Sequence, residues 1–378
     1  HCSQVQAVGS FGEPGSGERL AARLVTSFTE SVTQRHMTEL AAKSETLANS
    51  LNEEVKTLLA EGLSGAESGA IQTALEKLPR HRTSLSELSD RLSELGKSVS
   101  VDPVKTLRLI QIAQELSTDH WNITEGVHGL GRARFGVVIL SNRIARWAGR
   151  FPNHPYLAPL IVDPSKDGAQ LVYGLAKALT AKHLDKIRLQ RKAQLWLDAP
   201  PDLPGQLYDA DQIGWQDLSD EEKLACPPLL VFSDETALGR QGLSEFSSLL
   251  TSELPVKFVL LDSRNINEQS AEPALLAMAY QSAFVLSSSL AYPEQFASGL
   301  DQALAFAGPS LVHIHVPVPS EDGYSQAKTI ERARLAVEAR VHPLLTFDPS
   351  ADGTYGLRLS LEGNPSLTSD WGELNPLE

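Results

Sequence analysis

Apolar residues change their spacing near Gly131, and this change divides the chain into two kinds of sequence. Between residues 18 and 59 they recur mostly three or four positions apart, which places them on one face of a helix. The pattern returns at 71–78 and 84–95, and a further helix is predicted from Asp102-Pro103 to Leu116. We therefore expect a Gly-, Ser- and Pro-rich linker over residues 1–17 and a helical region over 18–118, whose helices pack within the chain rather than against a partner coil.

After Gly131 short apolar segments alternate with amphipathic ones. Segments of this kind are typical of strands that are buried on both faces of a parallel sheet and separated by helices. The pattern predicts an α/β domain with a doubly wound, mostly parallel sheet over residues 119–355, and a C-terminal tail over 356–378. A Pro- and Asp-rich connection is expected from 198 to 215. The predicted strands are 135–140, 157–162, 229–232, 256–261, 284–287 and 311–316, and the predicted helices are 168–197, 243–250, 274–280 and 294–307.

Composition excludes several classes of partner. The 378 residues are 42% hydrophobic and carry a formal net charge of −14, which fits two domains without a surface for nucleic acid or anionic lipid. Cys2 and Cys226 are too few for an iron–sulfur cluster or a structural zinc site on this chain alone. No apolar run approaches the roughly 20 residues that cross a bilayer. We expect no membrane span and a cytoplasmic location.

Polar residues follow two predicted strands at the points where ligands of such sheets bind. Asp234 follows the strand at 229–232, and Asp262-Ser263-Arg264-Asn265 follows the strand at 256–261. Carboxylate, hydroxyl and carbonyl oxygens are the ligands that Mg²⁺ prefers, and such an ion often bridges to a diphosphate. The alternative is that Asp234 and Ser263 cap helices, which is the usual role of Asp and Ser at a strand-to-helix turn.

Six segments between residues 132 and 349 carry a resemblance to a known family. Two lie at the strand ends just described: Pro228-Leu-Leu-Val-Phe-Ser-Asp-Glu-Thr-Ala-Leu-Gly-Arg-Gln-Gly-Leu243 and Val259-Leu-Leu-Asp-Ser-Arg-Asn265. They resemble a strand with a Gly-Asp-Gly turn and Gly-Gly-Leu, and a strand that ends in Asp-Thr-Glu-Val. The other segments are 137–147 with 152–156, 283–296, Gly308-Pro-Ser-Leu-Val-His-Ile-His-Val-Pro317 and His342-Pro-Leu-Leu-Thr-Phe-Asp-Pro349. Taken in chain order, the six segments resemble the thiamine-diphosphate domain of pyruvate:ferredoxin oxidoreductases.

The resemblance implies a cofactor, a metal and partner chains. The family uses thiamine diphosphate and Mg²⁺ to decarboxylate a 2-oxo acid and passes the electrons to iron–sulfur clusters. Carried over by position, the metal ligands fall on Asp234, Ser263 and the carbonyl of Asn265, and further cofactor-binding positions fall on Asn267 and Asn142. No catalytic residue can be assigned. The clusters would lie on other subunits or domains of a redox complex, and an oligomer is expected.

Departures from the family pattern concentrate at the turns that would touch the cofactor. The flanking glycines are replaced by Ser233 and Glu235. Without the glycines the backbone cannot come as close to a diphosphate, and Glu235 places a negative charge beside that anionic ligand. The Gly-Cys-Ser element has become Asn142-Arg143-Ile144, and the cysteines that precede it in the family are missing. These losses favour a structural or docking part of a redox complex with lost or weakened cofactor binding. The alternative is an active thiamine-diphosphate domain of a 2-oxoacid oxidoreductase.

Weaker signals leave further alternatives open. A Gly-rich stretch over 126–136 leads into a strand rather than a helix, yet the arginines from Arg132 to Arg143 could meet an anion in a regulatory α/β module. His313 and His315 alternate along a predicted strand, as either two metal ligands or a satisfied interior pair. Basic residues over 177–192 are expected on a solvated helix face or against an acidic neighbour.

Overall fold

The computed structural model describes residues 15–62, 103–148, 158–241, 243–263, 272–319 and 323–365. These residues form two compact units. The sheet unit draws on residues within 1–34, 133–180 and 219–378, and the helical unit on residues within 35–132 and 181–218. Two long helices, α2 (Gly17–Gly62) and α7 (Gly168–Asp198), contribute residues to both units.

The helical unit is built around one apolar cluster. Parts of α2 and α7 pack with α5 (Pro103–Thr124) through residues such as Leu51, Leu109 and Leu116, which are fully buried. The spacing of apolar residues in 18–59 and 103–116 therefore predicted real helices, whereas the predicted helices at 71–78 and 84–95 lie outside the described residues. The expected connection at 198–215 contains α8 (Leu203–Gln212), η1 (Trp215–Asp217) follows it, and α9 (Asp220–Leu224) comes after both.

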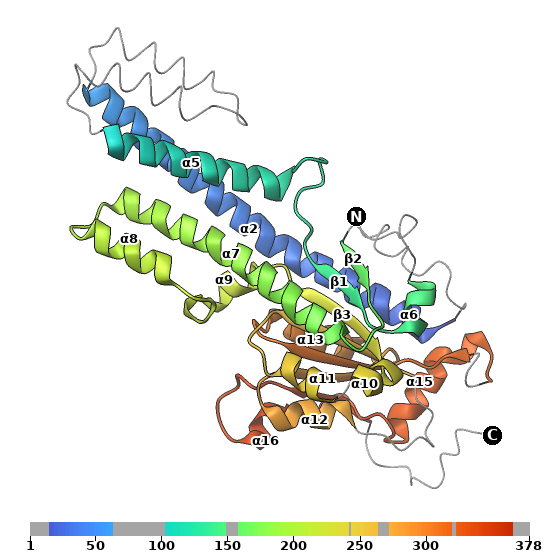
Figure 1. Cartoon of the computed structure of the whole chain (residues 1–378). Coiled ribbons are helices and arrows are strands. Elements are labelled where there is room, and N and C mark those ends of the chain that lie inside the picture. Colours follow the sequence, from blue (N-terminus) through green and yellow to red (C-terminus); the bar gives the residue numbers. More distant parts are fainter. Residues whose placement is uncertain are drawn as a thin grey trace. The chain divides into compact units, whose positions relative to one another are not determined.

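The sheet unit contains an eight-stranded sheet in the order β2-β1-β3-β4-β6-β5-β7-β8, and its first six strands in this order run parallel. Figure 1 labels three neighbours among them, β1, β2 and β3. The predicted fold class, a mostly parallel α/β sheet preceded by helices, is confirmed. Each predicted strand lies within a few residues of an observed one. The parallel strands are β1 (Gly136–Ile139), β2 (Leu160–Val162), β3 (Leu229–Asp234), β4 (Val256–Asp262), β5 (Phe284–Ser289) and β6 (Ser310–His315).

Helices cover both faces of this sheet, which is why its central strands read as continuous apolar runs. On one face, side chains such as Ile139 and Phe232 pack with α2, with α6 (Asn142–Trp147) and with α13 (Pro293–Ala305). On the other face, their neighbours Val138 and Val231 pack with α7, with α11 (Leu243–Leu250) and with α12 (Pro273–Tyr280).

Antiparallel strands close one edge of the sheet. β7 (Leu345–Phe347) pairs with β5, and β8 (Leu359–Ser360) pairs with β7. The pattern did not predict these two strands because each is only two or three residues long.

The remaining elements are α10 (Glu235–Gln241), η2 (Gln326–Lys328), α15 (Thr329–Glu338) and α16 (Tyr355–Arg358). No helix in the described ranges combines the length and the apolar composition that crossing a membrane requires.

Candidate functional site

The strand order of the sheet reverses at β1. Ligands of such sheets bind at the carboxyl ends of the strands beside this switch point, which here are β1 and β3. From β1 the chain passes through α6 to β2 on one side, and it later returns to β3 on the other side. Ser141 lies two residues after the end of β1 and caps α6, because its side chain accepts a hydrogen bond from the Ile144 N–H at 3.1 Å. The cap fixes the first turn of α6, which carries Arg143.

Asp234 ends β3 and is 2% exposed. Its Oδ1 accepts a hydrogen bond from the Ala237 N–H at 2.6 Å in the first turn of α10, so the carboxylate has the capping role that the alternative interpretation proposed. Its Oδ2 accepts a hydrogen bond from the Ser141 hydroxyl and lies 3.4 Å from Arg143 Nε. Both carboxylate oxygens therefore have partners within the chain.

Arg143 joins the ends of β3 and β4. Its guanidinium lies against Asp234 and donates to the hydroxyl of Ser263, which follows β4 and is buried. The same group donates to the Leu261 carbonyl at 3.3 Å. One cation of the chain thus contacts a carboxylate, a hydroxyl and a main-chain carbonyl, which are the kinds of oxygen that a magnesium ion would bind.

Two further carboxylates surround the same guanidinium. Glu18, in the first turn of α2, lies 3.1 Å from Arg143 and accepts a hydrogen bond from the Trp147 indole at 2.9 Å. Glu235 lies 3.3 Å from Arg143 and accepts a hydrogen bond from the Ser263 hydroxyl. Burial raises the pKa of Glu235, and the positive charge of Arg143 offsets part of that rise. We call these residues, together with Ser141 on Asp234, the arginine cluster: Glu18, Ser141, Arg143, Asp234, Glu235 and Ser263.

The residues proposed from the sequence as metal and cofactor ligands have different places in the structure. Asp234 and Ser263 come together in the arginine cluster. Asn142 begins α6 and is exposed. Asn265 and Asn267 lie outside the described residues. Sequence reasoning offered Arg143 only as a possible contact for an anion and did not foresee its contacts with Asp234 and Ser263. The available signal was its charge, because the corresponding Gly-Cys-Ser element of the family is neutral.

A second arginine of this stretch also faces a carboxylate. Arg134, at the end of the Gly-rich stretch, forms an ion pair with Glu30 of α2. Arg134 and Arg143 therefore each meet an acidic side chain within the sheet unit. The proposed anion site near these arginines remains a prediction.

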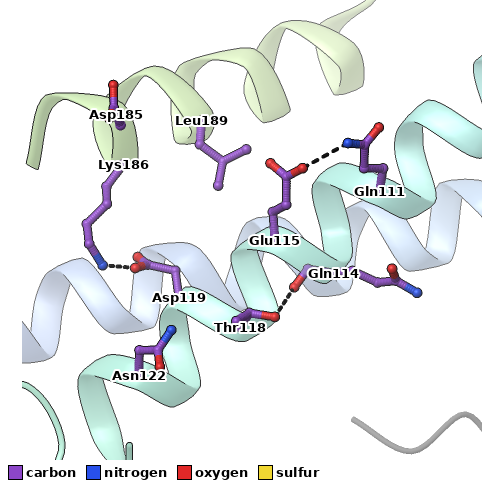
Figure 2. A pocket seen from close by; sticks show the side chains of 9 residues that line it. All are labelled: Gln111, Gln114, Glu115, Thr118, Asp119, Asn122, Asp185, Lys186 and Leu189. Atoms are coloured by element: carbon purple, nitrogen blue, oxygen red, sulfur yellow. Dashed lines mark hydrogen bonds and ion pairs between the residues drawn. The ribbon is translucent and has the colours of Figure 1, made fainter. Parts of the chain in front are cut away.

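An open groove of about 490 Å³ lies in the helical unit, between residues of α5 and α7. Figure 2 shows Lys186 of α7 in an ion pair with Asp119 of α5 across this groove, and Glu115 hydrogen-bonded to Gln111. Burial lowers the pKa of Lys186 to about 8. This contact agrees with the expectation that basic residues of 177–192 meet an acidic neighbour. None of the residues proposed for cofactor or metal binding lines the groove.

Curated proteins with detectable similarity include subunits of pyruvate synthase and of ketoisovalerate oxidoreductase. The chain is 26% identical over 205 residues to the pyruvate synthase subunit PorB of Methanocaldococcus jannaschii, an alignment that covers 52% of this chain and 65% of that protein. It is 38% identical over 64 residues to PorB of Methanothermobacter thermautotrophicus, covering 17% of this chain and 22% of that subunit. With the ketoisovalerate oxidoreductase subunit VorB of Pyrococcus abyssi the identity is 32% over 84 residues, covering 22% and 26%. The chain thus spans less than two thirds of each of these relatives, and no family model matches it.

Proposed function

This chain is a distant homologue of the PorB and VorB subunits of 2-oxoacid oxidoreductases, and from that relationship we propose that it is a structural or docking subunit of such a complex. In this proposal the sheet of the thiamine-diphosphate domain is retained, whereas the binding of magnesium and the diphosphate is lost. The iron–sulfur clusters and the chemistry with the 2-oxo acid belong to partner subunits. The chain contributes a folded surface that holds its neighbours in place.

The guanidinium of Arg143 is the observation that carries this proposal. It contacts Asp234 and Ser263, the two described residues at which the family resemblance places magnesium ligands. A metal ion at this point would have to separate the guanidinium from Asp234, Glu18 and Glu235. The ion would compensate the carboxylates, but the displaced guanidinium would lose all three partners, and breaking a buried ion pair costs ~3–5 kcal/mol. The residues as they stand therefore do not fit a magnesium diphosphate.

The charge around Arg143 also opposes a diphosphate. Three carboxylates, those of Glu18, Asp234 and Glu235, surround one cation, so the cluster carries an excess of negative charge when all three are ionised. Like charges repel strongly where little water screens them. Ser233 and Glu235 also replace the glycines whose bare backbone would let phosphates approach. Electrostatics and backbone chemistry thus support the same proposal.

A working thiamine-diphosphate domain is the second candidate, and one observation favours it. Asp234 and Ser263 end adjacent parallel strands, and both lie within reach of a single cation. If Arg143 turned away from them, their oxygens would face a common point. This candidate requires the chain to bind thiamine diphosphate, which the structural proposal does not.

A cofactor assay separates the two candidates. The purified chain is denatured, thiamine diphosphate is measured in the supernatant, and Mg²⁺ with thiamine diphosphate is titrated into the folded protein by calorimetry. We expect no released cofactor and no binding heat. Stoichiometric cofactor that disappears in Asp234→Ala would establish the second candidate instead. Arg143→Ser tests the proposed cause, because binding that appears only in this variant identifies the guanidinium as the obstacle.

A separate experiment tests the role in a complex. The complete protein is purified from its native source under mild conditions, and the co-purifying material is examined for iron–sulfur clusters by electron paramagnetic resonance. We expect the chain to elute with a cluster-bearing subunit in a fixed ratio. Elution as a lone chain, free of any cluster signal, would contradict the docking role.

A further inference from the structure

A second polar cluster lies at the carboxyl ends of β4 and β6. Asp262 ends β4, His313 lies in β6, and His342 follows α15. All three are buried, with 3%, 1% and 4% of their surfaces exposed. Each offers one ligand atom, and these atoms lie within 4.8 Å of one another. We call these three residues the histidine cluster.

Strand register and one turn bring the three residues together. In the β4–β6 pair, Asp262 is opposite His315 and Leu260 is opposite His313, so all four side chains share one face of the sheet. Leu260 packs in the apolar cluster beside α11 and α12, which identifies the face. His342 reaches it from the turn after α15, where its N–H donates to the Ala336 carbonyl at 3.1 Å.

Hydrogen bonds hold each imidazole by the same nitrogen. His313 Nε2 lies 2.8 Å from Asp262 Oδ2, so this nitrogen carries the proton and donates. His342 Nε2 lies 3.0 Å from the Ser288 carbonyl and 3.1 Å from the Ser287 hydroxyl. Because that hydroxyl donates to the Pro343 carbonyl, both oxygens accept from His342. In the neutral rings the proton is therefore on Nε2, and Nδ1 keeps its lone pair.

One of these lone pairs has no partner in the part of the chain that the structure describes. His313 Nδ1 is fully buried and accepts no hydrogen bond from any described residue. Buried polar atoms are nearly always satisfied, so a basic nitrogen of this kind calls for a proton donor or an electrophile. Metal-bound histidines commonly donate the other ring N–H to a carboxylate or a carbonyl, which fixes the ring for coordination. His313 on Asp262 and His342 on Ser288 have that arrangement.

The imidazole rings of this region lie against one another. The rings of His313 and His342 meet edge to face with their centroids 4.7 Å apart, and the ring of His315 lies 5.5 Å from that of His342. Three imidazoles and one carboxylate are thus neighbours in the sheet unit.

We propose that His313 and His342 bind a divalent transition-metal ion of the zinc class through their Nδ1 atoms, while Asp262 holds the ring of His313 by its Nε2–H. Imidazole nitrogen suits zinc, whereas magnesium prefers oxygen ligands alone. Zinc stands about 2.0–2.1 Å from its nitrogen ligands, so both Nδ1 atoms must come within that distance of the ion. The ion would tie the ends of β4 and β6 to the turn after α15. This structural metal site is separate from the metal-binding positions that the resemblance to the thiamine-diphosphate domain implies.

Metal analysis of the full chain tests this proposal. The protein is unfolded in chelator, refolded with or without ZnCl₂, passed through a desalting column and analysed for zinc by mass spectrometry. We expect one zinc per chain and a rise in melting temperature. His313→Gln and His342→Gln should each weaken zinc binding at least tenfold, as loss of a ligand or its support does. His183→Gln, which alters a fully buried histidine of the helical unit, is the matched control and should bind like the parent chain.

X-ray absorption of the zinc-loaded parent chain decides the matter even if both histidine variants fail to fold. The expected coordination shell has two or three imidazole nitrogens, at least one oxygen and no sulfur. Sulfur in the shell would place the ion at Cys2 or Cys226 and overturn the proposal. A folded chain that takes up no zinc would overturn it as well, and so would unchanged affinity in both cluster variants.

Discussion

The arginine cluster and the histidine cluster both form where parallel strands of one sheet end, but they differ in how their buried polar atoms are paired. In the first, the chain supplies its own cation, and both oxygens of Asp234 already have partners. In the second, Asp262 has a histidine partner and His313 Nδ1 has none among the described residues. The strand ends alone do not make a ligand site. A site needs polar atoms that the fold leaves without partners.

The largest effect should follow from removing the internal cation. Arg143→Met leaves Asp234, Glu18 and Glu235 together without compensation, and loss of one partner from a buried ion pair costs ~3–5 kcal/mol. Urea unfolding should show this loss in the free energy of unfolding.

Arg146→Met provides the control for this experiment, because Arg146 lies on the same helix and is exposed. Its effect should stay within about 0.5 kcal/mol. If Arg143→Met were no more harmful than this control, the arginine cluster would be a loose surface contact and the obstacle to magnesium would vanish.

Zinc should produce the next largest effect, and only through the histidine cluster. At a free zinc concentration 100 times the dissociation constant, binding raises the free energy of unfolding by about 2.7 kcal/mol. Asp262→Asn should abolish most of this gain, whereas Ser141→Ala, in the arginine cluster, should leave it intact. Denaturant titrations with and without zinc measure both values, and an equal gain in the two variants would erase the distinction between the clusters.

A smaller loss is expected when a hydroxyl of the arginine cluster is removed. Ser141→Ala deletes a donor to the Asp234 carboxylate and the cap of α6, and a hydrogen bond to a charged group contributes ~1.5–3 kcal/mol. Ser219→Ala removes only an exposed cap, that of α9, and should cost ~1 kcal/mol or less. Thermal unfolding of the two variants side by side measures the difference, and equal losses would mean that the contact to Asp234 contributes nothing.

A third buried charge, at the opposite ends of the strands, should give the smallest effect, a dependence of stability on pH. Lys257 is the second residue of β4, and its ammonium donates to the carbonyls of Phe306 and Gly308. Burial lowers its pKa to about 7. Between this value and the ordinary pKa near 10.4, the unfolded chain binds more protons than the folded chain, so stability rises with pH.

The difference in unfolding free energy between the parent chain and Lys257→Met should therefore increase by at most about 1.4 kcal/mol per pH unit between pH 8 and 9. Lys182→Met, which removes an exposed lysine, should give no such slope relative to the parent chain. A flat difference for Lys257→Met would show that its three oxygen partners keep the ammonium charged across this range.

Much of the fold could be predicted because local sequence determines it. Strands buried on both faces appear as short apolar runs, and the long helices show regular apolar spacing. The helix α8 was read as a loop because Pro204 and Gly205 lie in its first turn, where proline is tolerated and Asp202 provides the cap. Strands β7 and β8 are too short to carry a pattern, and only pairing with β5 defines them.

The sequence by itself determined the kind of domain, the strand ends that carry Asp234 and Ser263, and the glycine losses beside them. Only the tertiary structure decided which side chains meet there. Ser141 and Asp234 are 93 residues apart in the chain, and Arg143 and Ser263 are 120 apart. Strand order brings them together, and strand order with the turn after α15 brings Asp262, His313 and His342 together. Hydrophobic patterns report burial locally, but contacts between polar groups depend on pairing between distant strands, which no local pattern contains.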